Sequence, residues 1–157
     1  MTAVFKPPTP IDFLRLSTRL SIGLFGSIEQ GKASNWQQQA TDYFANDDID
    51  IYNPRRDNWD ASWEQSVTNP EFNKQVSWEL SALHGVSIRL FYFEPNTLAP
   101  ISLLELGLSH SLRNVVCCPS GYWRKGNIDI TCQRFRICQK PTLNEALDEC
   151  RTILLRL

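Results

Sequence analysis

The stretch VSIRLFYF (residues 86–93) decides the fold class. It is apolar on both faces, as expected for a strand buried inside a sheet. The residues before it, EFNKQVSWELSALHG (71–85), have helical periodicity and end at a glycine that is typical of a helix C-terminus. The residues after it, PISLLELGLSHSL (100–112), begin with a proline suited to the first helical position. A buried strand between two helices predicts a parallel sheet covered by helices.

The same alternation continues in both directions along the chain. Further strands are expected at 20–25, 49–53, 114–118 and 134–139, further helices at 32–46 and 142–157, and a loop at 119–130. About five parallel strands with helices on both faces predict a flavodoxin-like, doubly wound α/β fold, in which ligands bind at the carboxyl ends of the strands. The proline-rich residues 1–19 are expected to be an extension of a single domain formed by residues 20–157.

Composition narrows the classes of function. The chain has 157 residues, of which 42% are hydrophobic and 21% charged, with a net charge of −1. This balance argues against nucleic-acid binding, and no apolar run approaches the roughly 20 residues of a membrane span. The N-terminus lacks the apolar region of a signal peptide. Five cysteines without a CxxC pair favour neither a zinc site nor disulfides, so we expect reduced thiols in a cytoplasmic protein.

Two glutamates occupy positions that helical periodicity assigns to buried faces or their borders. The helix that begins at residue 100 has an apolar stripe expected to face the core, formed by Ile101, Leu104, Leu108 and Leu112. Glu105 lies in that stripe, and Glu79 borders the stripe of the preceding helix. A carboxylate in a core is costly unless it is paired or used. One interpretation is structural: Glu79 is solvated at the edge of its stripe, and Glu105 is stabilised by the helix dipole and a backbone N–H near the helix start. The other is a nucleophile or acid–base group held in a partly dry cleft.

The segment GSIEQGKA (26–33) follows the first expected strand and matches the GxxxxGK pattern of a phosphate-binding loop. Ala33 replaces the hydroxyl residue that would hold Mg²⁺, which makes an NTPase the weakest of the functional hypotheses. The segment is either a tight turn that needs glycine for its geometry, or a loop whose N–H groups at Ser27 and Ile28 face a ligand.

The segment NPRRDNWD (53–60) follows the next expected strand and combines basic, acidic and aromatic side chains. The residues concerned are Arg55, Arg56, Asp57, Trp59 and Asp60. An arginine pair suits a phosphate or carboxylate, and a tryptophan can stack on a base, so we expect the segment to contact substrate. The alternative is an arginine–aspartate lattice that only holds a long loop together.

The order of five segments resembles the nucleoside 2-deoxyribosyltransferase-like family over residues 20–130. These segments are GSIEQGKASNWQ, NPRRDNWD, QVSWEL, PISLLELGL and GYWRKGNIDI. The resemblance implies a flavodoxin-like fold and cleavage of the N-glycosidic bond of a (deoxy)nucleoside or nucleotide. It also implies a homo-oligomer with shared active sites, and it calls for no metal or organic cofactor.

The resemblance carries site residues onto this chain. It implies that Glu105 is the nucleophile that forms a covalent glycosyl intermediate, and that Glu79 contacts the substrate near the sugar and base. Gly26 and Ser27 are expected to line the sugar site, and Asn127 to reach the sugar hydroxyls across a subunit interface.

One departure concerns the proton donor. Transferases of the family have an aspartate six residues before the nucleophile, where this chain has Ala99. The acid that protonates the leaving base is therefore open between Glu79, Asp57 and Asp60. Glu105, close to a helix N-terminus, is expected to be ionised at neutral pH. Three outcomes remain open: transfer to another base, hydrolysis, and an inactive nucleotide-binding module.

Overall fold

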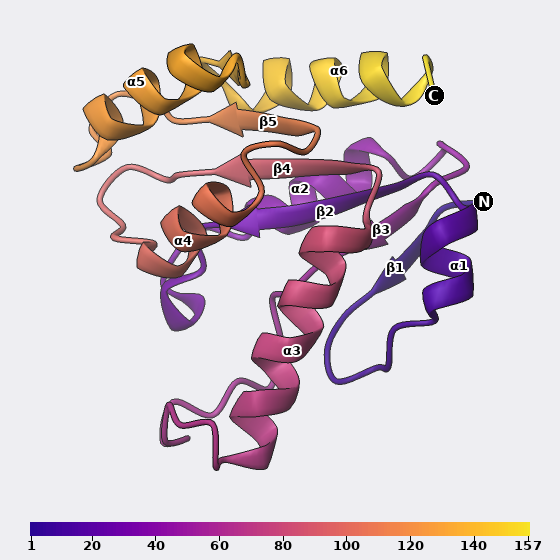
Figure 1. Cartoon of the computed structure of the whole chain (residues 1–157), viewed down its shortest axis with the longest axis vertical. Helices are drawn as coiled ribbons and strands as arrows, with labels where there is room; N and C mark the ends of the chain where they lie inside the picture. Colours follow the sequence, from indigo (N-terminus) through magenta and orange to yellow (C-terminus); the bar gives the residue numbers. More distant parts are fainter.

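The computed structural model describes residues 1–157 and contains one parallel sheet between two layers of helices (Figure 1). The strands are β1 (Ala3–Phe5), β2 (Ser21–Gly26), β3 (Asp50–Tyr52), β4 (Ile88–Tyr92), β5 (Asn114–Cys117) and β6 (Cys138–Lys140). The helices are α1 (Phe13–Thr18), α2 (Trp36–Tyr43), α3 (Pro70–Gly85), α4 (Pro100–Leu108), α5 (Lys125–Phe135) and α6 (Leu143–Leu154), and a short 3₁₀ turn, η1, spans Glu29–Gly31. This architecture confirms the predicted α/β class.

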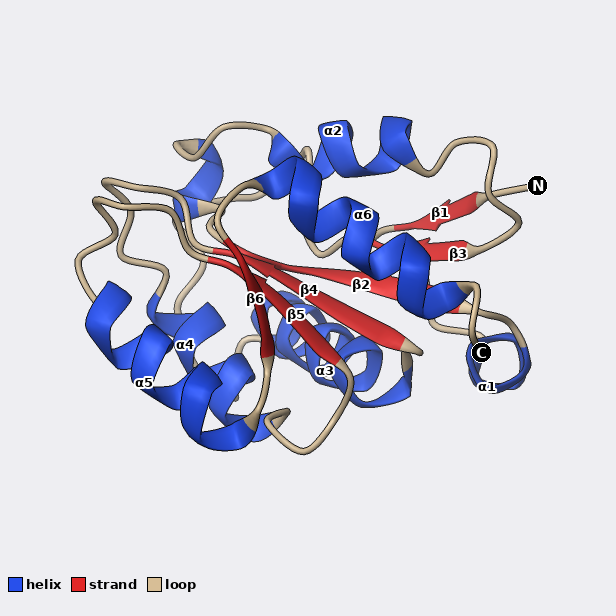
Figure 2. Ribbon diagram, turned by 90° about the horizontal axis from the view of Figure 1, so that it is seen from above, coloured by secondary structure: helices blue, strands red, loops and turns tan.

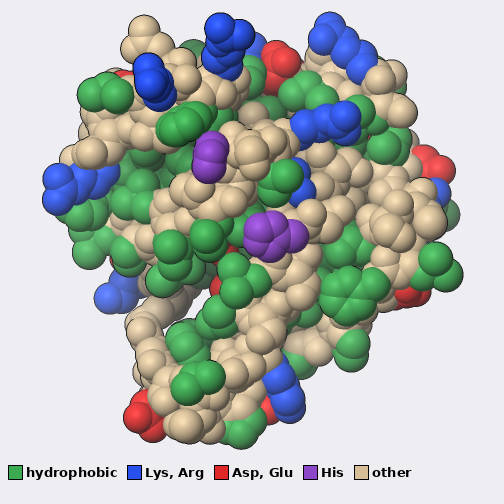
Figure 3. Space-filling model, viewed as in Figure 1, with side chains coloured by type: hydrophobic (Ala, Val, Ile, Leu, Met, Phe, Trp, Pro, Cys, Tyr) green, Lys and Arg blue, Asp and Glu red, His purple; other side chains and the backbone are tan.

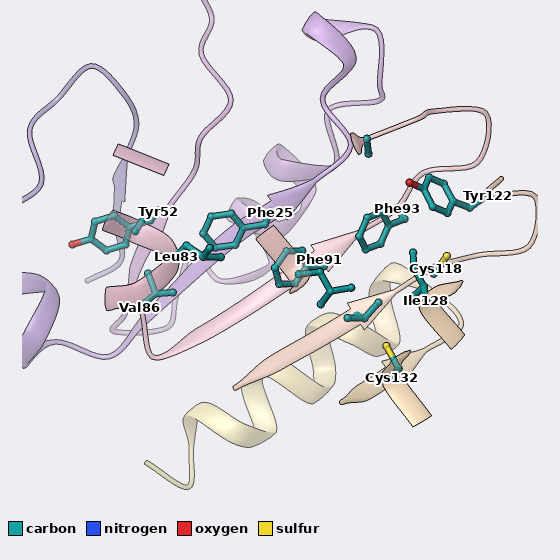
Figure 4. Close-up of a cluster of buried hydrophobic side chains, with 14 of the residues drawn as sticks. Phe25, Tyr52, Leu83, Val86, Phe91, Phe93, Cys118, Tyr122, Ile128 and Cys132 are labelled. Atoms are coloured by element: carbon teal, nitrogen blue, oxygen red, sulfur yellow. The ribbon is translucent and has the colours of Figure 1, made fainter. Parts of the chain in front are cut away.

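The helices divide between the two faces of the sheet (Figure 2). Helices α3, α4 and α5 cover one face, where α1 also packs, and α2 and α6 cover the other. Figure 4 shows the core under the first layer, which includes Phe25 of β2, Phe91 of β4 and Phe93 just after β4. Because both faces of the central strands are covered, those strands are mostly apolar, with Arg89 of β4 as a buried charged exception.

The strand order places the sheet's switch point between β2 and β4. The order is β1-β3-β2-β4-β5-β6, and every neighbouring pair is parallel. From β2 the chain moves outward to β3 and then returns to β4 on the other side. Ligands of such sheets bind where these two strands end, here at Gly26 and Tyr92.

The sheet has one strand more than the sequence predicted. Residues 1–19 contain β1, which pairs with β3 and extends the sheet at its edge. Arg15 of α1 donates two hydrogen bonds of 2.6 Å to the fully buried carboxylate of Asp50 on β3. The N-terminal residues are therefore packed onto the sheet by backbone pairing and an ion pair.

The prediction for residues 119–139 was wrong in part. Helix α5 begins at Lys125, inside the expected loop, and β6 is confined to Cys138–Lys140. Only Ile128 and Cys132 of α5 are buried, so its apolar face is too sparse to stand out in the sequence. The helix ends where Arg136 adopts a left-handed conformation, with φ 55° and ψ 38°.

Other helix predictions are confirmed. Helix α3 spans Pro70–Gly85, close to the predicted range, and the side chain of Asn69 caps its first turn. Thr142 caps α6 by accepting a hydrogen bond from the N–H of Glu145. No helix of the chain is both long enough and apolar enough to cross a membrane.

Candidate active site

Gly26 ends β2 at the switch point, and its geometry requires glycine. Its φ is +142°, and a Cβ placed on it would lie 2.2 Å from the carbonyl oxygen of Tyr92. A side chain at this position would therefore push β2 away from β4. Gly26 sets how closely the two strands approach at their carboxyl ends.

Ser27 ties together the two loops that leave these strands. Its hydroxyl is fully buried, lies 2.6 Å from the Thr97 hydroxyl and accepts a 2.9 Å hydrogen bond from the N–H of Glu94. Its own N–H donates to the carbonyl of Tyr92 at 2.9 Å. The expectation that the Ser27 N–H faces a ligand is therefore wrong, because that donor completes the β2–β4 pairing.

Helix α4 is oriented opposite to the sequence prediction. Its polar positions Ser102, Glu105 and Ser109 are buried. The apolar stripe instead faces outward, with exposed fractions of 57% for Ile101, 58% for Leu104, 49% for Leu108 and 37% for Leu112. Helical periodicity separates the two faces but does not say which one meets the core. The inward contacts that anchor α4 come from Leu106 and, partly, from Leu103.

Glu105 is consequently a buried carboxyl group. It is 6% exposed, and its carboxylate accepts no hydrogen bond from the chain. Burial, and after it the nearby charge of Glu79, raises the pKa of Glu105 well above its ordinary value. The direction of this shift runs against the expectation that Glu105 is ionised at neutral pH. The residue lies beyond the first turn of α4, where the helix dipole has little effect.

Glu79 provides the second carboxyl group, from α3. Burial raises its pKa to about 7, against the opposing effect of a hydrogen bond from Gln75. The Gln75 amide donates to Glu79 at 2.7 Å and to the carbonyl of Pro54 at 3.1 Å, which fixes this carboxyl relative to the end of β3. Burial disfavours the ionised form of both groups, and two ionised carboxylates here would repel each other. The pair therefore favours a state in which one of the two is protonated.

The two glutamates come from helices that border a hollow. In Figure 1, α3 extends away from the sheet, and the loop between β3 and α3 lies at its foot. Figure 3 shows the surface hollowed between α4, this part of α3 and the loop, with acidic atoms visible inside. The hollow lies on the α3–α4 face, next to the carboxyl ends of the sheet strands.

Arg55 holds two loops together. Its guanidinium donates to the carbonyls of Ser34 at 2.7 Å, Ala33 at 3.1 Å and Gly31 at 3.3 Å. These bonds attach the loop after β3 to the loop after β2. Most of the hydrogen-bonding capacity of Arg55 is therefore used within the chain.

The aromatic residues of the same loop pack on each other. Trp59 and Trp63 meet edge to face with ring centroids 5.1 Å apart, and the Arg56 guanidinium lies 4.8 Å from the centroid of Trp63. Two donors remain buried without a hydrogen-bond partner, Nη1 of Arg56 and Nε1 of Trp59. This part of the loop is ordered by stacking and still has unused donors.

The two aspartates of the loop differ from the buried glutamates. Asp57 is exposed and pairs with Lys6 at 3.2 Å. Asp60 is also exposed, and hydrogen bonds from the side chain and backbone of Ser62 lower its pKa. A general acid needs a pKa near the working pH. Among the three candidate proton donors, Glu79 has a raised pKa of about 7, and Asp60 is shifted in the opposite direction.

The chain is similar in sequence to one family of known proteins. The sequence model of a family described as nucleoside 2-deoxyribosyltransferase like matches residues 19–122. The chain belongs to this family. The match includes Glu79, Glu105 and the glycine turn after β2, whereas Asn127 lies beyond it.

The fold has a solved counterpart. A crystal structure of a conserved protein from Enterococcus faecalis V583 superposes with a TM-score of 0.60 at 12% identity, covering 88% of this chain and 99% of that one. At this identity the likeness concerns the fold. No functionally curated protein matches the chain.

The structure does not connect Asn127 to the carboxyl pair. Asn127 is exposed on α5, and its side chain makes no hydrogen bond within the chain. A role across a subunit interface, as the family resemblance implies, stays a prediction.

Gln75 and Thr97 also support the site, although neither was predicted from the sequence. Gln75 lies four residues before Glu79 on α3, a spacing that brings helix side chains together and could have identified it. Thr97 has no such signal, because its partner Ser27 is 70 residues away.

Proposed function

We propose that this member of the nucleoside 2-deoxyribosyltransferase-like family cleaves the N-glycosidic bond of a (deoxy)nucleoside through a glycosyl intermediate on Glu105 and transfers the sugar to another base. The observation that supports it best is that the buried carboxyl of Glu105 lies near a second, half-buried carboxyl, that of Glu79, and that the pKa of both groups is raised. Two carboxyl groups with different roles are what retaining glycosidic cleavage requires.

The bond changes assign one task to each carboxyl. The bond between the anomeric carbon and the base nitrogen breaks, and its electron pair leaves with the base, which takes a proton. A carboxylate oxygen of Glu105 bonds to the anomeric carbon. In the second half, the nitrogen of an incoming base attacks that carbon, Glu105 leaves as a carboxylate, and the proton of the incoming base returns to the acid.

Glu79 is the proposed acid. Its pKa of about 7 leaves a substantial share of the carboxyl protonated at neutral pH. Before substrate binds, burial also favours the protonated form of Glu105. Positive charge that develops on the sugar favours the ionised form of Glu105. When Glu105 is ionised in this way, Glu79 holds the proton and donates it to the leaving base.

Two alternatives remain. If water attacks the intermediate, the protein is an N-glycosidase, and the unused Nη1 donor of Arg56 favours a substrate with a 5′-phosphate. If no bond is cleaved, the protein is a nucleotide-binding module, for which Ala99 in place of the family's aspartate is the main support. The roles of Gly26, Ser27, Arg55, Asp57, Trp59, Asp60 and Asn127 in substrate binding belong to the same proposal.

We further propose that the protein is a homo-oligomer. The outward face of α4 presents three exposed aliphatic side chains, Ile101, Leu104 and Leu108. Contiguous apolar surface of this kind is typical of protein interfaces. A second copy that covers this face can bring the exposed Asn127 to a neighbouring site. All five cysteines are unpaired thiols, which supports placement in the reducing cytoplasm.

Incubation with a panel of deoxynucleosides, deoxynucleotides and NAD, with and without a second free base, tests this function. Exchange of the base supports a transferase, and release of free base without exchange supports a hydrolase. Binding without turnover would overturn the enzymatic proposal and support the binding module.

A further inference from the structure

We infer that Glu29 is a positioning residue that fixes the start of α4 and thereby the direction of Glu105. For its catalytic consequence this inference rests on the proposed function. Glu29 lies in the short 3₁₀ turn after β2, far from α4 in the sequence. Its Oε1 atom accepts hydrogen bonds from the N–H groups of Leu98 at 2.9 Å and Ala99 at 2.7 Å.

The backbone before α4 needs such a support. Ala99 occupies the N-cap position with φ 45° and ψ 50°, a left-handed conformation that is unfavourable for alanine. Its side chain offers no oxygen to cap the helix, and Pro100 follows it without an N–H. The Glu29 carboxylate, from another loop, does not cap the free N–H groups of the helix but binds the two N–H groups just before it, those of Leu98 and Ala99, and so holds this turn in place.

The peptide of Leu98 is held on its other side as well. Its carbonyl accepts hydrogen bonds from the Tyr122 hydroxyl at 2.5 Å and from the Trp123 indole at 3.0 Å. Both donors precede α5. The turn before α4 is thus hydrogen-bonded to two other loops, to the loop after β2 through Glu29 and to the loop after β5 through Tyr122 and Trp123.

A second carboxylate joins the loop after β4 to the loop after β2, this time with the acceptor in the loop after β4. Glu94, which follows β4, accepts a 2.9 Å hydrogen bond from the N–H of Ser34 in the loop after β2. The buried hydroxyl contact between Ser27 and Thr97 also joins the loops after β2 and β4. Glu29 is the member of this set that reaches the residue next to α4.

The position of this turn decides where Glu105 lies. Glu105 is six residues after Ala99 on a helix of nine residues, so a shift or rotation at the helix start moves its carboxyl relative to Glu79. Small displacements of a reacting group reduce the rate without abolishing substrate binding. Loss of the Glu29 contact is therefore expected to lower kcat much more than it changes KM.

The test compares Glu29→Ala with Glu29→Gln, whose amide oxygen can accept the same two hydrogen bonds. Hydrogen–deuterium exchange of the α4 peptide is measured alongside steady-state base release from the best deoxynucleoside of the panel. For Glu29→Ala we expect faster exchange in the first turn of α4 and a fall in kcat of about 100-fold, with KM within about twofold of wild type. Glu29→Gln is expected to retain wild-type exchange and most of kcat.

Glu149→Ala is the matched control, because it also removes a paired glutamate but lies on α6 at the opposite face of the sheet. Unchanged α4 exchange in Glu29→Ala would overturn the inference. An equal loss in both Glu29 variants would also overturn it, since it would point to the charge of Glu29 and not to its contacts. If the wild-type protein cleaves no substrate, the proposed function fails, and the exchange measurement alone decides whether Glu29 fixes α4.

Discussion

Glu79 and Glu105 bring two carboxyl groups from neighbouring helices close enough for their charges to repel. Burial raises the pKa of both residues, and the charge of Glu79 raises that of Glu105 further. The one hydrogen bond that either carboxylate accepts comes from Gln75. The site therefore keeps one buried and one half-buried acid incompletely compensated, at a cost to stability that a merely structural role does not explain.

The first prediction concerns stability against pH. The folded protein holds the Glu79 proton up to a pKa of about 7, whereas an unfolded chain releases it near 4.5, so the folded state binds more protons between these values. The free energy of unfolding therefore falls as pH rises through this window, with about 3 kcal/mol attributable to Glu79. Urea denaturation at pH 5, 6, 7 and 8 measures this pH dependence of the free energy of unfolding.

Glu79→Gln isolates this contribution. Glutamine is neutral at every pH, so the variant is expected to gain stability relative to wild type as pH increases from 5 to 8. Parallel pH profiles for the two proteins would show that Glu79 is ordinarily solvated and would remove the basis for its role as the acid.

A second prediction concerns the close approach of β2 and β4. Gly26→Ala places a methyl group against the Tyr92 carbonyl at a positive φ, so we expect a loss of about 3 kcal/mol in the free energy of unfolding. Gly126→Ala is the control, because its methyl group meets nothing within 4 Å on helix α5. The control should be neutral or slightly stabilising. Equal stability of the two variants would contradict the assigned role of Gly26.

A third prediction concerns the outward face of α4. Leu104 is 58% exposed, so Leu104→Glu should leave the folded subunit intact and reduce self-association. Size-exclusion chromatography with light scattering measures the mass. Leu155→Glu, at an 82% exposed leucine after α6, is the control and should keep the wild-type mass. A Leu104→Glu protein with unchanged oligomeric mass would place the interface elsewhere.

The fold was predictable where burial leaves a simple pattern. Strands covered on both faces are continuous apolar runs, and α3 and α6 have recognisable caps. The pattern failed for α5, which buries only Ile128 and Cys132, and for β1, whose three residues are stabilised mainly by pairing with β3. Long-range pairing of this kind has no local signature in a sequence.

The site was predictable in part for a similar reason. Periodicity singled out Glu105, although it assigned the wrong face of α4 to the core. It could not assign Arg55, because an arginine that binds three backbone carbonyls looks in sequence like one that binds a phosphate. Glu29 was overlooked because its partners Leu98 and Ala99 are about 70 residues away and contribute only backbone groups.

The central claim is that Glu105 forms the bond to the sugar, and Glu105→Gln tests it most directly. The variant should fold with at least wild-type stability at pH 8, because glutamine removes a buried carboxylate that accepts no hydrogen bond. Base release from the best deoxynucleoside of the panel is measured for both proteins. We predict that the rate falls by about 1,000-fold or more in Glu105→Gln. Release at the wild-type rate by the folded variant would contradict the account.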